Sequence, residues 1–581
     1  MNVPLRQYYA LLSSYLRPQI ARVAALALLL FGGIGLQLVN PQIMRGFIDS
    51  ARSDGPPEYL YRLALLFMGL AVLQQVVAIG TTYFGENVGW TATNFLRADL
   101  AEHCLGLDMR FHNTHTPGEM IERLDGDVTA LSNFFSQFVI QVFGSAMLML
   151  GVLVLLFRED WRVGLALTVF AVLAMAVLLR LRNIAVPHWT ASREAHANLF
   201  GFLEERLSGT EDIRSAGAKP YVLLRFFQLM RDVMQKQIRA GLMVNIMVNS
   251  GEMVFAVGTA AAFAVGAYVF EAGAVSIGTV YLIFNYTMML IWPMQRITQQ
   301  LQNLQLAAAG IVRIQGLLRE QPTIADGDGP DLPPGPLTVE FRHVSFSYDS
   351  DEPVLRDLDF HLEAGKVLGL LGRTGSGKTT ITRLLFRLYE PQEGGIEVGG
   401  VPLGQTRLAD LRRHVGMVTQ NVQLFQASVR DNLTFFDPSI PDERLLAVIE
   451  ELGLGSWFGS LPQGLDTELE SAGGGLSTGE AQLVAFTRIF LQNPGLVILD
   501  EASSRLDPAT EHLIERAVDR LMQGRTGIVI AHRLGTVQRA DEIMILEEGR
   551  ILEHGERHAL VADPGSRFSG LLRTGLEEML V

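Results

Sequence analysis

The chain has 581 residues, with 61 acidic against 47 basic side chains, a formal net charge of −14 and a single cysteine. At roughly 150 residues per domain, it is too long for one compact unit. Apolar residues make up 49 %, charged ones only 19 %, and the mean hydropathy is +0.24, which argues against a disordered, fibrous or fully soluble protein. One thiol, Cys104, excludes a disulfide framework and a multi-cysteine zinc site. The acidic balance argues against nucleic acid as a partner.

The N-terminal 22 residues do not have the pattern of a cleavable signal. Arg6 and Arg17 flank a mixed polar and aromatic stretch that lacks an apolar centre. Leucines and Tyr8 recur there at helical spacing, which predicts either a short amphipathic helix at a membrane surface or an ordinary capping helix.

Apolar residues are concentrated in the first 300 positions. A membrane-spanning helix needs about 20 mostly apolar residues. Six segments qualify, at about 22–46, 60–84, 133–157, 161–185, 247–270 and 277–299. Asn40-Pro41 lies near the end of the first, where a proline is tolerated if neighbouring helices repair the hydrogen bonding. We therefore expect a transmembrane domain over residues 1–320.

The arginines and lysines predict the orientation of these segments. The stretch 180–240 carries ten of them, whereas the loop after the fifth segment carries none. Because such residues favour the cytoplasmic side, we expect the two long, helix-patterned connections, 85–132 and 186–246, and both termini to be cytoplasmic. The sequence thus predicts a multi-pass protein of the inner or plasma membrane.

Residues 321–337 hold five prolines and three glycines, which is typical of a linker. After them the pattern changes to alternating strands, turns and helices, as in a soluble α/β domain over 338–581. We therefore expect a membrane all-α six-helix domain followed by an α/β domain.

A strand-like run ending at Leu371 leads into G-R-T-G-S-G-K-T and then into a helical run. This matches the phosphate loop G-x-x-x-x-G-K-[ST] in its strand–loop–helix context. The glycines allow backbone N–H groups to surround a phosphate, Lys378 adds a point charge, and Thr379 offers a hydroxyl to Mg²⁺. The pattern predicts an ATP site formed by Gly372, Arg373, Thr374, Gly375, Ser376, Gly377, Lys378, Thr379 and Thr380.

Two carboxylates follow the buried-strand run 496–499, namely Asp500 and Glu501. A carboxylate at the carboxyl end of a strand beside a phosphate loop can hold Mg²⁺ through water. The next one, Glu501, is placed to polarise an attacking water. Together with the phosphate loop, this pair predicts ATP hydrolysis. The expected fold class is therefore a membrane all-α six-helix domain followed by an α/β P-loop ATPase domain.

The six spans and the nucleotide domain together resemble a half-transporter of the ATP-binding cassette exporter type, over essentially the whole chain and most strongly over 338–560. Tyr348, in F-S-Y, resembles the aromatic residue that stacks on adenine, and Gln420, in V-T-Q, the glutamine that touches Mg²⁺ and the membrane domain. The resemblance also implies that a signature acts on the ATP bound by a second cassette, and its residues are Ser477, Thr478, Gly479 and Glu480. It further implies an aspartate loop at Asp507 and a switch histidine, His532, that bonds the γ-phosphate.

Two segments of the membrane half resemble the family's cytoplasmic loops, from Arg110 to Asp127 and from Gly201 to Thr210. The resemblance implies a coupling helix in each, near Phe111–Gly118 and Ser208–Lys219, that docks on a nucleotide domain.

The signature departs from the family's L-S-G-G-Q, because Thr478 replaces a glycine and Glu480 a glutamine. Ser471 and Arg505 are also atypical. The residues that serve the chain's own phosphate site are all kept. This one-sided pattern favours a heterodimer with a second half-transporter and one degenerate site; a homodimer that tolerates the changes stays open.

The resemblance implies an ATPase subunit that exports an amphipathic or hydrophobic substrate, such as a drug, lipid or peptide, by alternating access. An importer with the same fold, for example for siderophores, and a nucleotide-sensing membrane regulator are the alternatives. Glu252 is the only acid well inside a predicted span, so it is the first candidate for the substrate cavity. Alternatively, it lies at the cytoplasmic interface beside an arginine. The expected partners are the second half-transporter, membrane lipid and the substrate.

Overall fold

The computed structural model describes residues 13–53, 55–133, 140–348, 352–419, 422–470, 476–500, 508–530 and 537–574. The chain forms two compact units. Unit 1 comprises Met1–Gly106 and Thr116–Glu320, and unit 2 comprises Leu107–His115 and Gln321–Val581. The short segment Leu107–His115 thus belongs to unit 2, although it is separated from the rest of that unit by more than 200 residues of sequence.

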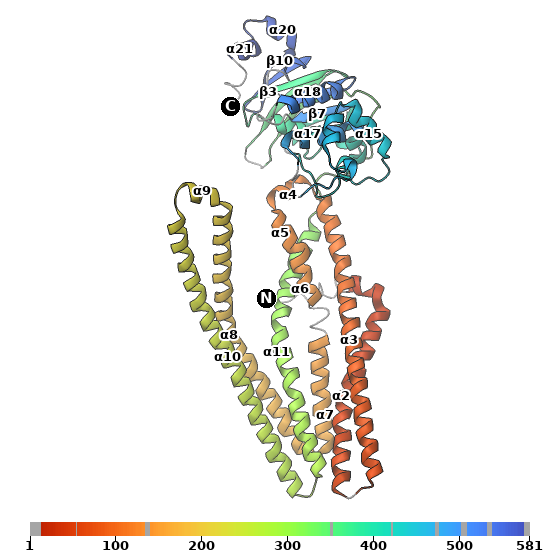
Figure 1. Ribbon diagram of the computed structural model, residues 1–581, viewed down its shortest axis with the longest axis vertical. Coiled ribbons are helices and arrows are strands. Elements are labelled where there is room, and N and C mark those ends of the chain that lie inside the picture. The colour runs from red at the N-terminus through yellow and green to blue at the C-terminus, as the bar shows by residue number, and fades with distance from the viewer. Residues whose placement is uncertain are drawn as a thin grey trace. The chain divides into compact units, whose positions relative to one another are not determined.

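All secondary-structure elements in the described part of unit 1 are helices (Figure 1). Its elements are η1 (Arg17–Gln19), α2 (Ile20–Arg52), α3 (Pro57–Gly106), α5 (Pro117–Ile121), η2 (Glu122–Asp127), α6 (Val128–Asn133), α7 (Gly144–Glu159), α8 (Trp161–Ser208), α9 (Thr210–Ser215), α10 (Lys219–Glu271) and α11 (Ile277–Arg319). Among the described residues, six helices are long and apolar enough to span a membrane: Ser13–Arg52, Pro57–Gly106, Ile140–Glu159, Trp161–Ser208, Lys219–Glu271 and Ile277–Thr298. Each segment expected from the sequence overlaps one of them.

The helix α2 continues through Pro41 and ends only at Arg52. A proline removes one backbone hydrogen bond from a helix. In the turn before it, the Tyr286 hydroxyl of α11 donates to the Leu38 carbonyl at 2.8 Å, and Gln42 Nε2 donates to the same hydroxyl at 3.2 Å. A neighbouring helix therefore supplies polar partners around the proline, as a membrane helix requires.

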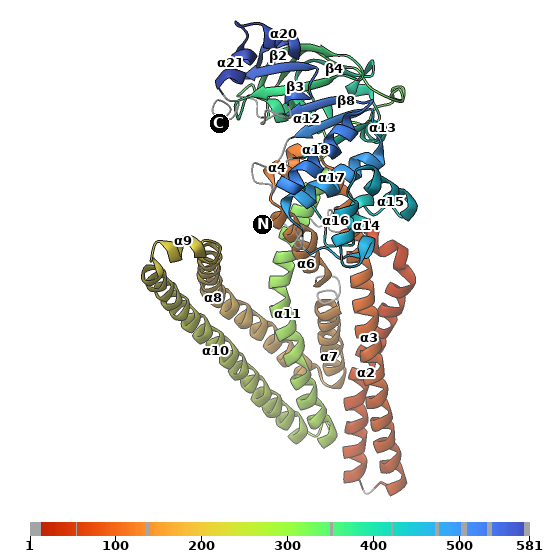
Figure 2. The ribbon, with the colours of Figure 1, turned by 45° about the horizontal axis from the view of Figure 1, so that its top comes forward.

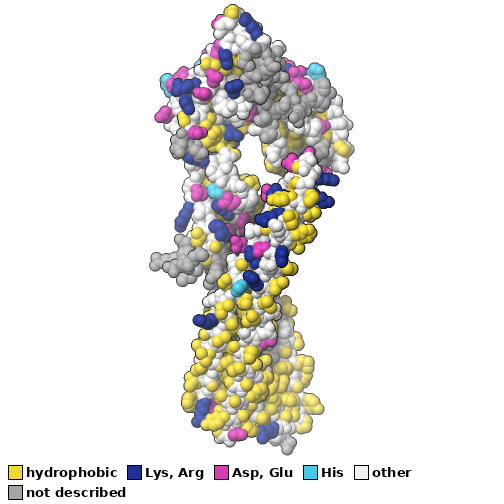
Figure 3. Space-filling view, turned by 90° about the vertical axis from the view of Figure 1, so that its left-hand side faces the viewer, with side chains coloured by type: hydrophobic (Ala, Val, Ile, Leu, Met, Phe, Trp, Pro, Cys, Tyr) yellow, Lys and Arg dark blue, Asp and Glu magenta, His cyan; other side chains and the backbone are white. Residues whose placement is uncertain are grey.

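The long connections of unit 1 are mostly extensions of the spanning helices. The helices α8 and α10 run side by side and are joined at their far end by the short α9, as Figures 1 and 2 both show. Figure 3 shows hydrophobic side chains covering one part of unit 1, with charged side chains gathered toward the part that carries α9. This division is expected where one part of a helix lies in lipid and its continuation lies in water.

Unit 2 contains two sheets. The first has the order β2-β1-β4-β5 and is antiparallel; the second has the order β10-β9-β3-β8-β7-β6 and is parallel except for β10. The strands are β1 (Val339–Phe346), β2 (Leu355–Leu362), β3 (Val367–Gly372), β4 (Glu393–Val398), β5 (Val401–Pro402), β6 (Val415–Val418), β7 (Leu496–Asp500), β8 (Thr526–Ile530), β9 (Glu542–Glu547) and β10 (Arg550–Glu556).

Every residue of β3 and β8 is buried, as expected for strands of a parallel sheet covered on both faces. The helices of this unit are α4 (Met109–Thr114), α12 (Lys378–Leu385), η4 (Leu403–Gln405), α13 (Leu408–His414), α14 (Val429–Thr434), α15 (Asp442–Glu451), α16 (Gly455–Ser460), η5 (Gly464–Asp466), α17 (Thr478–Gln492), α18 (Pro508–Met522), α20 (Arg557–Ala562) and α21 (Arg567–Thr574). Residues 321–337 contain neither helix nor strand.

Candidate functional site

The phosphate loop joins the buried strand β3 to the helix α12. Gly375 and Gly377 have φ values of +84° and +105°, which L side chains rarely adopt. A Cβ on Gly377 would also lie 2.5 Å from a methyl group of Leu355. Glycine is therefore required here, and the resulting turn places the loop at the N-terminus of α12, where a helix attracts anions.

Lys378 is the first residue of α12 and is 6 % exposed. Its ammonium donates hydrogen bonds to the carbonyls of Gly372 at 2.6 Å and Arg373 at 2.9 Å. Burial lowers the pKa of Lys378, and the Asp500 carboxylate opposes that shift. Among the described residues, no carboxylate forms a salt bridge with this ammonium, so the group suits an anionic phosphate.

Two further polar groups line the loop. The Ser376 hydroxyl is buried and has no hydrogen-bond partner within the described part of the chain. Thr379 Oγ1 lies 3.5 Å from Oδ2 of Asp500, which ends β7. An unsatisfied buried hydroxyl beside a cation fits a phosphate oxygen, and a hydroxyl facing a carboxylate fits Mg²⁺, a hard cation that prefers oxygen.

The Tyr348 ring lies next to this loop. Its hydroxyl is 3.2 Å from Thr380 Oγ1 and accepts a hydrogen bond from Arg383 at 3.1 Å. Its ring packs edge-on against Tyr389, with centroids 5.1 Å apart. The tyrosine predicted to stack on adenine is thus fixed by the helix that follows the phosphate loop.

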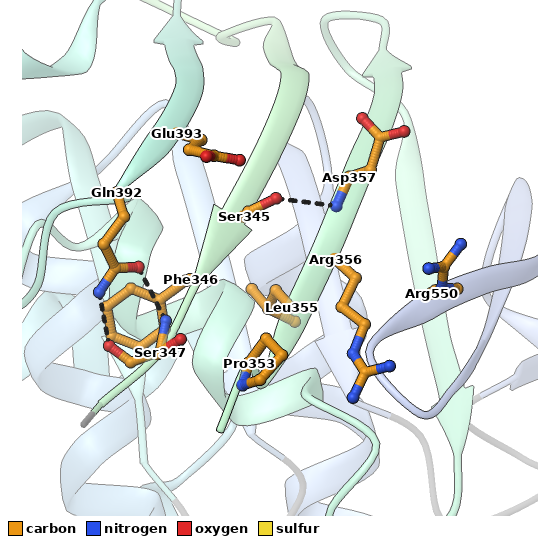
Figure 4. A pocket seen from close by; sticks show the side chains of 10 residues that line it. All are labelled: Ser345, Phe346, Ser347, Pro353, Leu355, Arg356, Asp357, Gln392, Glu393 and Arg550. Carbon is orange, nitrogen blue, oxygen red and sulfur yellow. Dashed lines mark hydrogen bonds between the residues drawn. The ribbon is translucent and has the colours of Figure 1, made fainter. Parts of the chain in front are cut away.

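The backbone just before Tyr348 is held by Gln392. Ser347 N–H donates to Gln392 Oε1 at 2.8 Å, and Gln392 Nε2 donates to the Ser347 carbonyl at 2.7 Å (Figure 4). These residues line a surface pocket of 570 Å³ between β1, β2 and the residue before β4. Arg356 and Arg550 also line it, together with the acids Asp357 and Glu393, so its rim carries charges of both signs.

The segment Leu107–His115, which overlaps the coupling helix predicted near Phe111–Gly118, contacts Tyr389. Asn113 Nδ2, in α4, donates to the Tyr389 hydroxyl. Asp108 accepts hydrogen bonds from Thr323 N at 2.7 Å and from Thr323 Oγ1 at 2.6 Å. Burial acts to raise the pKa of Asp108, but these hydrogen bonds outweigh it, so the pKa is lowered. The sequence analysis missed Tyr389, which belongs to no motif.

The altered signature forms the N-terminus of α17. The Ser477 hydroxyl accepts a hydrogen bond from Glu480 N at 3.3 Å, and the Glu480 carboxylate accepts one from Ser477 N at 2.7 Å. This reciprocal pair is a capping box. The Glu480 carboxylate is therefore held at the helix N-terminus, where it offsets the positive end of the helix dipole.

The structure brings Tyr348, Lys378, Thr379 and Asp500 together, and Ser477 to Glu480 stand on a separate helix. Gln420, Glu501, Asp507 and His532 lie outside the described residues. Glu252 is exposed on α10, and no arginine forms a salt bridge with it in the described part of the chain.

Comparisons with known proteins agree with this geometry. Residues 23–294 match the family model for the ABC transporter transmembrane region, and residues 355–504 match the ABC transporter model. A "Multidrug resistance ABC transporter ATP-binding and permease protein" of Lactococcus lactis subsp. cremoris is 30 % identical over 91 % of this chain and 89 % of its own. The chain belongs to the ATP-binding cassette transporter family.

Two other similar proteins show what kind of ABC transporter this chain resembles. A "Fatty acid ABC transporter ATP-binding/permease protein" of Mycobacterium bovis is 30 % identical over 81 % of this chain and 74 % of its own. The solved "Structure of a bacterial Atm1-family ABC exporter with ATP bound" has the same fold, with a TM-score of 0.79, 24 % identity, and coverage of 96 % of this chain and 98 % of that one. The chain is therefore a multi-pass half-transporter with an exporter-type fold, which binds ATP, couples its hydrolysis to transport and acts as a dimer.

Proposed function

We propose that this half-transporter exports an amphipathic or hydrophobic compound across the cell membrane by alternating access. The observation that carries the proposal is the joining of six spanning helices to a complete phosphate loop in one chain. The proposed domains are a transmembrane domain over 1–320, a linker over 321–337 and a nucleotide-binding domain over 338–581. The protein lies in the inner or plasma membrane, with both termini in the cytoplasm.

In the proposed reaction, a water attacks the γ-phosphate in line with the leaving group. Lys378 and the N–H groups of the loop stabilise the phosphate charge, Tyr348 stacks on adenine, and Glu501 accepts or orients the proton of the water. Bound Mg²⁺ would supply further neutralisation of the phosphates, and Thr379, Gln420 and Asp500 are its proposed holders.

We also propose that the second subunit is a different chain. In the head-to-tail dimer of this family, the signature of one subunit acts on the ATP bound by the other, so Ser477 and the start of α17 would face the γ-phosphate of the partner's ATP. The Glu480 carboxylate bonded to Ser477 N would repel that phosphate, and Thr478 adds a side chain where the phosphate must approach closely. An intact signature from a different partner would complete the site built on Lys378.

The proposed cargo class is supported by the Mycobacterium relative, whose name refers to fatty acid. Glu252, exposed on α10, is the proposed acidic group of the transport cavity. An importer would share the same ATP site, so the direction is tested by following the cargo in sealed vesicles with ATP on the outside. Uptake into inside-out vesicles supports export, and loss from them supports import.

The central test is Glu501→Gln in the full transporter complex. We expect ATP affinity to stay within about twofold and steady-state hydrolysis to fall by at least about 100-fold, because an amide cannot accept the proton of the water. Glu443→Gln, an exposed change on α15, is the matched control. Hydrolysis within about threefold of the unmutated complex would remove Glu501 from this role. An unmutated complex that binds ATP without hydrolysing it would favour the nucleotide-sensing alternative.

A further inference from the structure

A groove in unit 1 lies between α8 and α10. It consists of two adjoining pockets, with volumes of 290 and 650 Å³, which share Trp189, Arg193 and Val244. Thr298 of α11 lines the smaller pocket, so the groove opens on the side of the helix pair that faces α11.

The charged groups of this groove are all basic. Arg182 and Arg193 line it, together with His196, and neither pocket is lined by an aspartate or glutamate. Among the described residues, neither arginine forms an ion pair or donates a hydrogen bond to another side chain. A cleft lined by charge of one sign attracts ions of the opposite sign, so two arginines without a carboxylate partner favour an anionic ligand.

The remaining walls are suited to a hydrocarbon chain. Ala185, Val186, Val244 and Met247 line the smaller pocket, beside Arg182. At the junction of the two pockets, the Arg193 guanidinium lies 5.5 Å from the centre of the Trp189 ring, which orients it by a cation–π interaction. The groove therefore presents apolar surface next to fixed positive charge.

The position of the groove along α8 fits the same ligand. The helix begins at Trp161, and Arg182 lies about 30 Å further along it at 1.5 Å per residue. This is the thickness of the hydrocarbon core of a bilayer. In the proposed orientation, Arg182 thus lies at the cytoplasmic boundary of the bilayer, where the headgroup of an amphiphile in the inner leaflet would be found.

We propose that this groove is the intake site for a single-chain anionic amphiphile, which is held by the positive charge of Arg182 and Arg193 and by the apolar wall between them. The inference rests on the proposed export function and narrows its cargo to a chemical class. Binding to the groove needs no nucleotide, which separates its test from the test of hydrolysis.

The experiment measures binding of radiolabelled laurate to the full transporter complex, without ATP, in nanodiscs of phosphatidylcholine. The uncharged methyl laurate and the cationic dodecyltrimethylammonium are the matched probes. We expect laurate to bind at least about tenfold more tightly than either, and each of Arg182→Gln and Arg193→Gln to weaken laurate binding by about tenfold, because positive charge that attracts the carboxylate is lost. Arg182→Lys should retain most of the binding.

Arg180→Gln is the control, since Arg180 is exposed on the same helix but lines neither pocket. An equal loss in this variant would show a general surface-charge effect and overturn the proposal. So would laurate binding that is unchanged in the Arg182→Gln, Arg193→Gln double variant. If phosphatidylglycerol in the nanodiscs binds at these arginines while laurate does not, the groove holds a membrane lipid and the cargo assignment is wrong. Intact ATP hydrolysis in such a case would leave the proposed function standing.

Discussion

The Lys378 ammonium is bonded to the carbonyls of its own loop, and burial lowers its pKa. A buried cation with only neutral acceptors gains most when a charged acceptor arrives. We therefore expect Lys378→Ala to weaken ATP binding by about 10- to 100-fold in equilibrium titrations with a fluorescent ATP analogue. Lys366→Ala removes the same charge from an exposed turn before β3 and should leave the affinity unchanged. An unaltered affinity in Lys378→Ala would mean that ATP binds elsewhere.

At the level of elements, α4 is attached to the rest of unit 2 through Tyr389. Replacing Tyr389 by Phe keeps the ring against Tyr348 and removes the hydroxyl that accepts from Asn113. One hydrogen bond contributes about 1 kcal/mol, so amide hydrogens of 109–115 should exchange about fivefold faster. Tyr221→Phe, an exposed tyrosine of α10, should change nothing. Unchanged exchange in Tyr389→Phe would show that this contact does not hold α4.

The linker is attached to the same unit by Arg387, which is 3 % exposed. Its guanidinium donates to the carbonyls of Ala325, Gly404 and Thr406 at 2.8, 2.9 and 2.8 Å. Truncation leaves these carbonyls unsatisfied, so we expect Arg387→Ala to lower the free energy of unfolding of unit 2 by about 2–4 kcal/mol. A lower thermal unfolding temperature would report this loss.

The control for this truncation is Arg407→Ala. Arg407 also reaches the linker, through Asp331, but both side chains are more than half exposed. An exposed ion pair contributes about 0–1 kcal/mol, so this variant should unfold close to the unmutated temperature. Equal effects in the two variants would argue against a special role for the buried guanidinium.

At the scale of the whole molecule, the capped signature helix predicts a complex with two unequal sites. This chain purified alone should show little ATPase activity, because each site of a homodimer would use Glu480 and Thr478 against the γ-phosphate. Restoring Thr478→Gly and Glu480→Gln in the heterodimer should barely raise turnover, since the site they serve would still lack a good base from the partner. Native mass spectrometry and ATPase assays test both statements. A stable homodimer that hydrolyses about 1–10 ATP per second would contradict them.

Several features could be predicted from the sequence because their physical cause lies within a short stretch of chain. Apolar runs long enough for a bilayer identify the spans, and the phosphate loop is one contiguous turn between strand and helix. The spacing Ser477-x-x-Glu480 is itself a capping-box pattern, so this pair of hydrogen bonds could also be predicted from the sequence, where Glu480 stands out only as a departure from the signature.

The tertiary structure alone decided the contacts between residues far apart in the chain. Asn113 meets Tyr389 across 276 positions, and Tyr286 donates to Leu38 across 248. The groove with Arg182 and Arg193 exists only because α8 and α10 pack side by side. Local patterns specify which face of a helix is apolar, but which helix covers that face depends on packing among all of them. For this reason the phosphate loop could be predicted from the sequence, whereas the groove proposed for the cargo emerged only from the folded bundle.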